Sequence, residues 1–145
     1  MIYLGADKHG YKTISIVKEY LSKQKRKHID LGVQTETDDT RIEEIIFDVA
    51  KKVLKEDLNI GILSCGTGVG VEVGVNKFSG IRGCLATNKT IAKYAKEKDK
   101  CNVLCLVGWH PNKKIIWGIL DAWFNSHYDG SAGRLKMFET FDTWH

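Results

Sequence analysis

Short apolar runs alternate along this chain with longer segments in which apolar residues recur every three or four positions. Five runs have the length and composition of buried strands, at residues 1–6, 28–33, 59–64, 83–87 and 102–108. Four segments between them carry one apolar face at helical spacing, at residues 11–23, 41–55, 69–78 and 90–98. The alternation predicts βαβ units, and therefore a parallel sheet covered by helices on both faces.

Beyond the fifth strand the pattern predicts one more helix and then becomes ambiguous. Pro111 stands where a helix would begin, and Ile115, Ile119 and Trp123 mark one face of it. The tail from Asp129 onward shows no period that assigns an element to it. No repeat, linker or low-complexity segment divides the chain, so we expect one α/β domain of three layers over residues 1–145.

The composition is that of an ordinary globular protein, with 43% hydrophobic and 28% charged residues among 145. No apolar run is long enough for a signal peptide or a membrane span. We therefore expect a cytoplasmic protein whose four cysteines are reduced. None of these cysteines forms a C-x-x-C pair, which argues against a zinc site, and we expect neither a metal nor a cofactor.

The net charge is +4, and the only dense basic run is KQKRKH at residues 23–28. Such a run can complement the dipole at a helix end, or it can bind nucleic acid. No aromatic residues interleave with it, as stacking platforms for bases would require. We therefore interpret the run as a solvated helix end and expect neither a nucleic-acid nor a membrane partner.

The stretch LSCGTGVGVEVGVNK, residues 63–77, places a thiol before a glycine-rich turn. Gly66, Gly68 and Gly70 permit a tight turn and a close approach of the backbone to a ligand. The stretch is neither a Walker loop nor the dinucleotide fingerprint. Its N–H groups could bind a phosphate or stabilise an oxyanion, and a following helix favours the thiolate form of Cys65. Cys65 is therefore either a packed thiol at a strand end or a base that takes a proton next to a carbonyl.

A second polar segment, ADKHG, follows the first predicted strand directly. Ligands of parallel sheets bind outside the carboxyl ends of the strands, so we expect this segment and the Cys65 loop at one edge of the sheet. Asp7 can cap a helix, or it can serve a sugar hydroxyl and assist ring opening. Lys8 and His9 can contact a phosphate.

With these residues in place, the chain resembles the ribose-5-phosphate isomerase B and galactose-6-phosphate isomerase family. The resemblance runs in order along nearly the whole chain, in the segments GADKHG, GILSCGTGVG, NKFSGIRG, CNVLCL and DAWFNSHYDG. It implies a Rossmann-like α/β/α subunit with a five-stranded parallel sheet. It also implies a homodimer or higher homo-oligomer with active sites between subunits, and metal-independent aldose–ketose isomerisation through an enediolate.

Carried over residue by residue, the resemblance makes Cys65 the base that moves a proton between C1 and C2 of the sugar, with Thr67 assisting. The loop that would hold the developing anion matches Gly66, Thr67, Gly68, Val69 and Gly70. Asp7 matches a catalytic residue that contacts the sugar near its ring oxygen. Lys8, with His9 beside it, stands where the family has a histidine that contacts the phosphate.

Other positions depart from the family pattern. Lys98 and Asp99 occupy the places of a ring-opening histidine and the asparagine after it, so we expect Lys98 to act in catalysis and Asp99 to contact the substrate. Trp109 replaces an arginine, and it could stack on a sugar face or pack at a subunit interface. Arg134 and Lys136 are the candidates for phosphate binding in a tail that is expected to reach the partner subunit.

Three functions are compatible with these residues. The first is conversion of ribose 5-phosphate to ribulose 5-phosphate. The second is the same chemistry on galactose 6-phosphate or an unphosphorylated sugar, because expected arginines are missing and lysine is a poorer phosphate ligand in geometry. The third is a non-catalytic partner subunit of a hetero-oligomeric isomerase, because the ring-opening histidine is missing.

Overall fold

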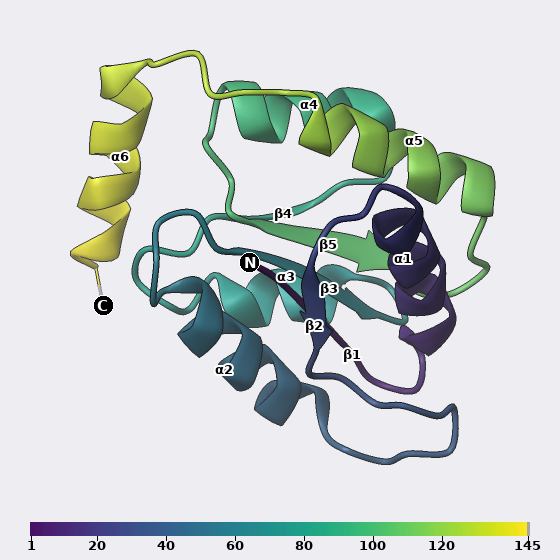
Figure 1. Ribbon diagram of the computed structural model, residues 1–145. Coiled ribbons are helices and arrows are strands. Elements are labelled where there is room, and N and C mark those ends of the chain that lie inside the picture. The colour runs from purple at the N-terminus through teal and green to yellow at the C-terminus, as the bar shows by residue number, and fades with distance from the viewer. Residues whose placement is uncertain (145) are drawn as a thin grey trace.

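A computed structural model describes residues 1–144 of the chain (Figure 1). Its sheet consists of β1 (Ile2–Ala6), β2 (His28–Asp30), β3 (Ile60–Cys65), β4 (Gly83–Leu85) and β5 (Val103–Val107). The helices are α1 (Tyr11–Lys23), α2 (Ile42–Val53), α3 (Val69–Val75), α4 (Lys89–Glu97), α5 (Lys113–Phe124) and α6 (Ala132–Asp142). The strands are all parallel, in the order β2-β1-β3-β5-β4. The predicted α/β class and five-stranded parallel sheet are confirmed.

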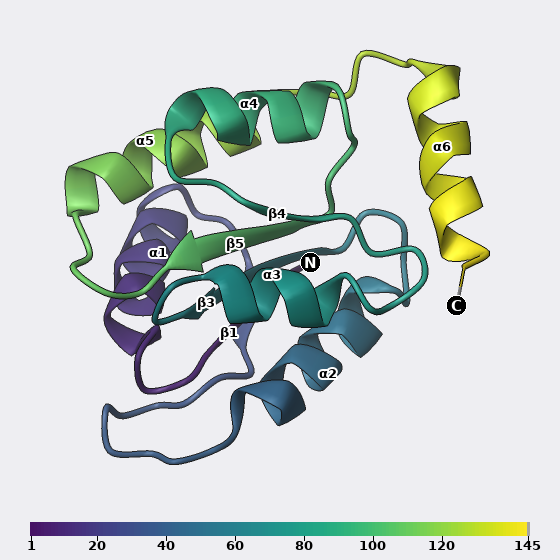
Figure 2. The ribbon, with the colours of Figure 1, turned by 180° about the vertical axis from the view of Figure 1, so that it is seen from behind.

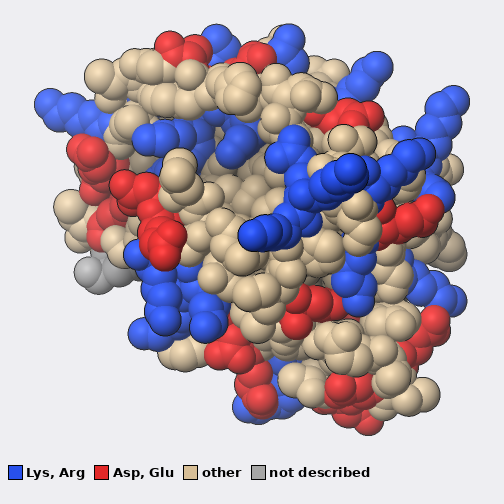
Figure 3. All heavy atoms as spheres, viewed as in Figure 1, with Lys and Arg blue, Asp and Glu red and all other residues tan. Residues whose placement is uncertain are grey.

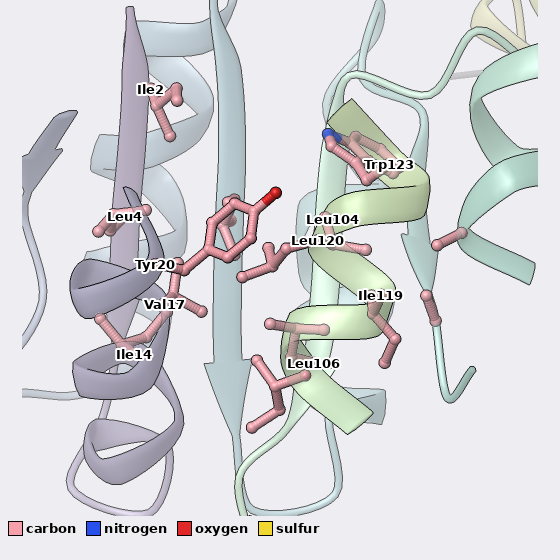
Figure 4. Close-up of a cluster of buried hydrophobic side chains, with 14 of the residues drawn as sticks. Ile2, Leu4, Ile14, Val17, Tyr20, Leu104, Leu106, Ile119, Leu120 and Trp123 are labelled. Atoms are coloured by element: carbon pink, nitrogen blue, oxygen red, sulfur yellow. The ribbon is translucent and has the colours of Figure 1, made fainter. Parts of the chain in front are cut away.

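Helices cover both faces of the sheet, and each face has its own hydrophobic core. In both ribbon views α4 and α5 lie above the strands, while α2 and α3 lie below them (Figure 1 and Figure 2). Side chains from α1 and α5, such as Val17 and Trp123, pack over Leu4 and Leu104 of the sheet (Figure 4). The other core joins α2 and α3 to the opposite face of the strands. Because the central strands are buried on both faces, they appear in the sequence as continuous apolar runs.

The tail that showed no clear period forms α6, which stands beside the amino ends of the strands (Figure 1). None of its residues is buried. Hollows of about 330 and 400 Å³ lie between α6 and the rest of the molecule. A helix that buries no face needs no apolar stripe, which explains why periodicity did not reveal it. No helix within residues 1–144 has the length and apolar character needed to cross a membrane.

The basic run at residues 23–28 lies against aromatic rings that come from a distant part of the chain. The Arg26 guanidinium lies 4.2 Å from the centre of the Phe124 ring, and Lys23 Nζ lies 5.2 Å from that of Trp117. Lys and Arg side chains on the visible face stand among acidic ones (Figure 3). No aromatic residue interleaves with this run in the sequence, but α5 supplies aromatic neighbours to it in the folded chain.

Candidate active site

The carboxyl ends of β1, β3 and β5 form the edge of the sheet that carries the glycine loop. Ala6 pairs with Ser64, and Cys65 pairs with Val107. Asp7, the residue after Ala6, therefore leaves the sheet beside Cys65. The strand order reverses between β1 and β3, and ligands of such sheets bind outside the carboxyl ends at this switch point. The structure thus brings Asp7 and the Cys65 loop to one edge, as their positions after strands predicted.

Cys65 is the last residue of β3, and only 8% of it is exposed. Its Sγ lies against the first turn of α3, since a Cβ atom on Gly70 would be 3.6 Å from it. The missing side chain of Gly70 leaves the backbone of that turn open to the thiol. In the loop between them, Thr67 Oγ1 accepts a hydrogen bond from the Val69 N–H at 3.2 Å. A thiol and several backbone N–H groups therefore share one small region, as proton abstraction next to a carbonyl requires.

Asp7 shapes the turn that leads into α1. Its Oδ1 accepts hydrogen bonds from the N–H groups of His9 and Gly10, both at 3.0 Å. Gly10 is the N-cap of α1, and no described side chain donates or accepts a capping hydrogen bond at this end of the helix. Among residues 1–144, Asp7 Oδ2 takes part in no hydrogen bond of this kind. Asp7 therefore orders the turn before α1 but is not the N-cap of that helix, so the capping interpretation is wrong, and its Oδ2 is compatible with a contact to a sugar hydroxyl.

Lys8 is engaged by an acidic residue that sequence reasoning missed. Its Nζ lies 2.6 Å from Asp39 Oδ1, and this hydrogen-bonded partner raises the pKa of Lys8. Lys12 and Glu36 form a second, longer contact at 3.6 Å. Both pairs connect the acidic loop TETDDT, residues 35–40, to the start of α1. The opposite charges of these two segments were the feature of the sequence that could have predicted the contact. For Lys8 to contact a phosphate, the anion has to replace Asp39.

The turn after β5 packs directly on the glycine loop. The Gly108 N–H donates to the Cys65 carbonyl at 2.8 Å, and the Trp109 N–H donates to the Gly66 carbonyl at 3.0 Å. The Trp109 indole covers Gly66 so closely that a Cβ atom there would lie 2.5 Å from Cε2. Trp109 is nevertheless 54% exposed. Its indole therefore forms an open aromatic wall beside the loop, and Gly66 is required for that contact.

The remaining candidates lie at the opposite end of the sheet, beside the amino ends of its strands. Lys98 follows α4 and precedes the amino end of β5, with its Nζ 2.9 Å from Asp129 Oδ2. This partner raises the pKa of Lys98. Asp99 forms an ion pair with Arg134 of α6, the helix that also carries the exposed Lys136. A single chain therefore does not bring these four residues to Cys65.

The other three thiols differ from Cys65 in their surroundings. Burial raises the pKa of Cys105, and a hydrogen bond with Cys84 together with burial raises that of Cys101. Cys84 is half-buried on the edge strand β4. Among residues 1–144, no three His, Cys, Asp or Glu side chains form a group that could hold a metal ion. Cys65 is thus the thiol that the fold places next to a glycine loop.

A thiol, a glycine loop and an adjacent carboxylate at one end of a parallel α/β/α sheet suit the removal of a proton next to a carbonyl. The sequence model of the Ribose/Galactose Isomerase family matches residues 2–138, and the chain belongs to this family. It is 35% identical over 144 residues to the probable ribose-5-phosphate isomerase B of Mycoplasma pneumoniae, covering 95% of this chain and 94% of that protein. It is 33% identical over 128 residues to the galactose-6-phosphate isomerase subunit LacB of Clostridium acetobutylicum, covering 87% and 72%.

A solved structure gives the same result for the fold. Ribose-5-phosphate isomerase B from Mycoplasma genitalium, determined with bound ribulose-5-phosphate, superimposes with a TM-score of 0.91 at 28% identity. The similarity covers 99% of this chain and 97% of that one. The family suggested by the sequence motifs is therefore confirmed.

Proposed function

We propose that this protein interconverts ribose 5-phosphate and ribulose 5-phosphate in the cytoplasm, through an enediolate and without a metal. The observation that carries the proposal is the Cys65 thiol, held against the open backbone of the Gly70 turn and next to Asp7. The relatives named for ribose 5-phosphate and the homologue with bound ribulose-5-phosphate support this choice of substrate.

In the proposed reaction, the Cys65 thiolate removes the proton from C2 of the open-chain aldose. The electron pair of the C–H bond forms the C1–C2 double bond, and O1 gains negative charge. N–H groups of the loop from Gly66 to Gly70, other than the Val69 N–H that donates to Thr67, stabilise this charge. The thiol then returns the proton to C1, while the hydroxyl proton on O2 moves to O1. The exposed Thr67 hydroxyl stands on the loop as a group that can carry that second proton.

We also propose that the active site is completed by a second copy of the chain. Lys98, Asp99, Arg134 and Lys136 lie at the edge of the sheet that is remote from Cys65, so a partner copy is needed to bring them there. The helix that carries Arg134 buries none of its side chains in its own subunit. Such a helix is free to contact a partner, as the family resemblance implies.

Two inactive variants are expected to restore activity when they are mixed, if each site combines Cys65 of one copy with Arg134 of the other. Cys65→Ala and Arg134→Ala would be unfolded together, refolded and assayed. In a symmetric dimer, a random mixture should recover about a quarter of the wild-type activity, because half the dimers then hold one intact site. Each variant refolded alone is the control. A mixture as inactive as both controls would contradict a shared site.

Ribose 5-phosphate is expected to be the best substrate of the purified protein. If Lys8 contacts the phosphate of the substrate in place of Asp39, inorganic phosphate should compete for it, and we expect the apparent KM to rise with added phosphate. Measurements of kcat/KM for ribose 5-phosphate, galactose 6-phosphate and free ribose would decide. A higher kcat/KM for galactose 6-phosphate or for a free sugar would overturn the proposal that ribose 5-phosphate is the substrate. Activity only after addition of a related second subunit would instead favour the hetero-oligomeric alternative.

A further inference from the structure

The sheet edge that carries Cys65 also carries an imidazole, His9, to which the proposed isomerisation step assigns no part. Gly108 lies between the carbonyl groups of His9 and Cys65, so that a side chain on Gly108 would overlap both. The two segments are therefore in contact with the same residue. His9 is exposed, and it lines a cleft of about 250 Å³ together with Asp7 and Lys8. The imidazole thus lines the same cleft as the carboxylate that is expected to contact the sugar.

Two contacts hold His9 in place. Its N–H donates to Asp7 Oδ1 at 3.0 Å, which fixes the backbone of the residue in the turn. The imidazole meets the Trp109 indole edge to face, with ring centres 6.0 Å apart and planes at 83°. This geometry is favourable for aromatic pairs. Because Trp109 also covers Gly66, the same indole links the imidazole to the loop that follows Cys65.

The other candidates for opening the sugar ring are less suited to that step. Lys98 is paired with Asp129, which keeps its ammonium group protonated even where a partner copy brings it to the site. Asp99 is paired with Arg134. His110, the imidazole of the turn after β5, lines a separate and mostly apolar hollow with Pro111 and residues of α5. Among the side chains described, His9 is the imidazole that shares a cleft with Asp7.

We propose that His9 is the catalytic residue that opens the furanose ring, acting within the same chain as Cys65. This proposal rests on the proposed sugar-phosphate isomerase function. Imidazole is the side chain that exchanges protons near neutral pH. It takes the proton of the anomeric hydroxyl, the C1–O4 bond breaks as the C1 carbonyl forms, and the same proton passes to O4. The open-chain aldose then presents C2 to Cys65. The ring-opening acid/base is thus a residue of the turn between β1 and α1, and it is not supplied by a partner subunit.

Replacement of His9 by asparagine tests this proposal, because asparagine keeps a planar polar side chain but cannot shuttle a proton. Turnover of ribose 5-phosphate should fall about 100-fold, as for the loss of a general acid/base. Ribulose 5-phosphate cannot form a furanose, because its 5-hydroxyl is esterified. The exchange of its C1 proton with D2O, followed by NMR, should therefore persist in the variant. The kinetic isotope effect on ribose 5-phosphate deuterated at C2 should fall toward unity, since ring opening becomes the slow step.

His110→Asn is the matched control, since His110 has a φ of 55° that asparagine tolerates. It should resemble the wild type in turnover, exchange and isotope effect. The proposal would be overturned if His9→Asn turned over normally, if exchange and turnover fell together, or if His110→Asn showed the loss instead. A wild-type protein that converts no sugar phosphate would disprove the proposed function itself, whatever His9 does.

Discussion

Replacement of Cys65 by alanine is expected to lower the turnover of ribose 5-phosphate by about 10³-fold, because a positioned general base contributes about 10²–10⁴-fold. Among residues 1–144, Cys65 Sγ is the one atom beyond the turn itself that comes within 4 Å of a Cβ atom built on Gly70. The variant would therefore keep the loop but lose the group that takes the C2 proton. We would measure kcat with a coupled assay on the purified protein.

The fold of the Cys65→Ala variant should persist, since loss of one sulfur atom at a strand end costs about 1 kcal/mol of unfolding free energy. Thermal unfolding by circular dichroism would establish this. Cys84→Ala is the control, because it removes a half-buried thiol that is not part of the glycine loop. Its turnover should equal that of the wild type. A Cys65→Ala protein with unchanged turnover would eliminate the thiol as the base.

Replacement of Gly68 by alanine is expected to damage both stability and activity. Gly68 has a φ of 78°, where a side chain costs about 1–2 kcal/mol. The new Cβ would also lie 2.5 Å from Leu85 Cδ1 and 2.9 Å from the Leu106 carbonyl oxygen. Overpacking of this kind costs about 1–3 kcal/mol more. We expect the free energy of unfolding to fall by about 2–5 kcal/mol, measured by urea denaturation.

Gly130→Ala separates the two causes, because Gly130 has a φ of 85° but a Cβ atom added there would meet nothing within 4 Å. It should lose only about 1 kcal/mol, from the backbone alone. The Gly68→Ala protein that remains folded should also lose about 100-fold in kcat/KM. A displacement of the loop by about 1 Å would move its N–H groups away from the substrate oxygen that they are proposed to stabilise. Equal stability losses in both variants would show that packing against Leu85 does not constrain the loop.

The class of fold was predictable because most of its elements bury a face. The strands β1, β3 and β5 and the helices α1 to α5 each carry buried apolar residues at the spacing that burial imposes, while β2 and β4 at the edges of the sheet bury none. Cys65 and Asp7 were predictable as neighbours for a related reason. Both follow buried strands, and a parallel sheet gathers the carboxyl ends of its strands at one edge.

The ion pairs were not predictable in the same way. Lys8 with Asp39 and Lys98 with Asp129 each join residues that are 31 positions apart. Charged residues at the surface carry no period, so their partners are set by where loops come to lie. The same holds for Arg26, whose aromatic neighbour comes from α5.

Local sequence was therefore sufficient for most of the elements, the layers and the glycine loop, since each depends on residues close together in the chain. Tertiary structure alone established the strand order, the contact of Trp109 with Gly66 and His9, and the helix α6. It also separated Lys98, Asp99 and Arg134 from Cys65 by placing them at opposite edges of the sheet. These features depend on distances between segments far apart in the chain, and such distances are set by the packing of the whole core.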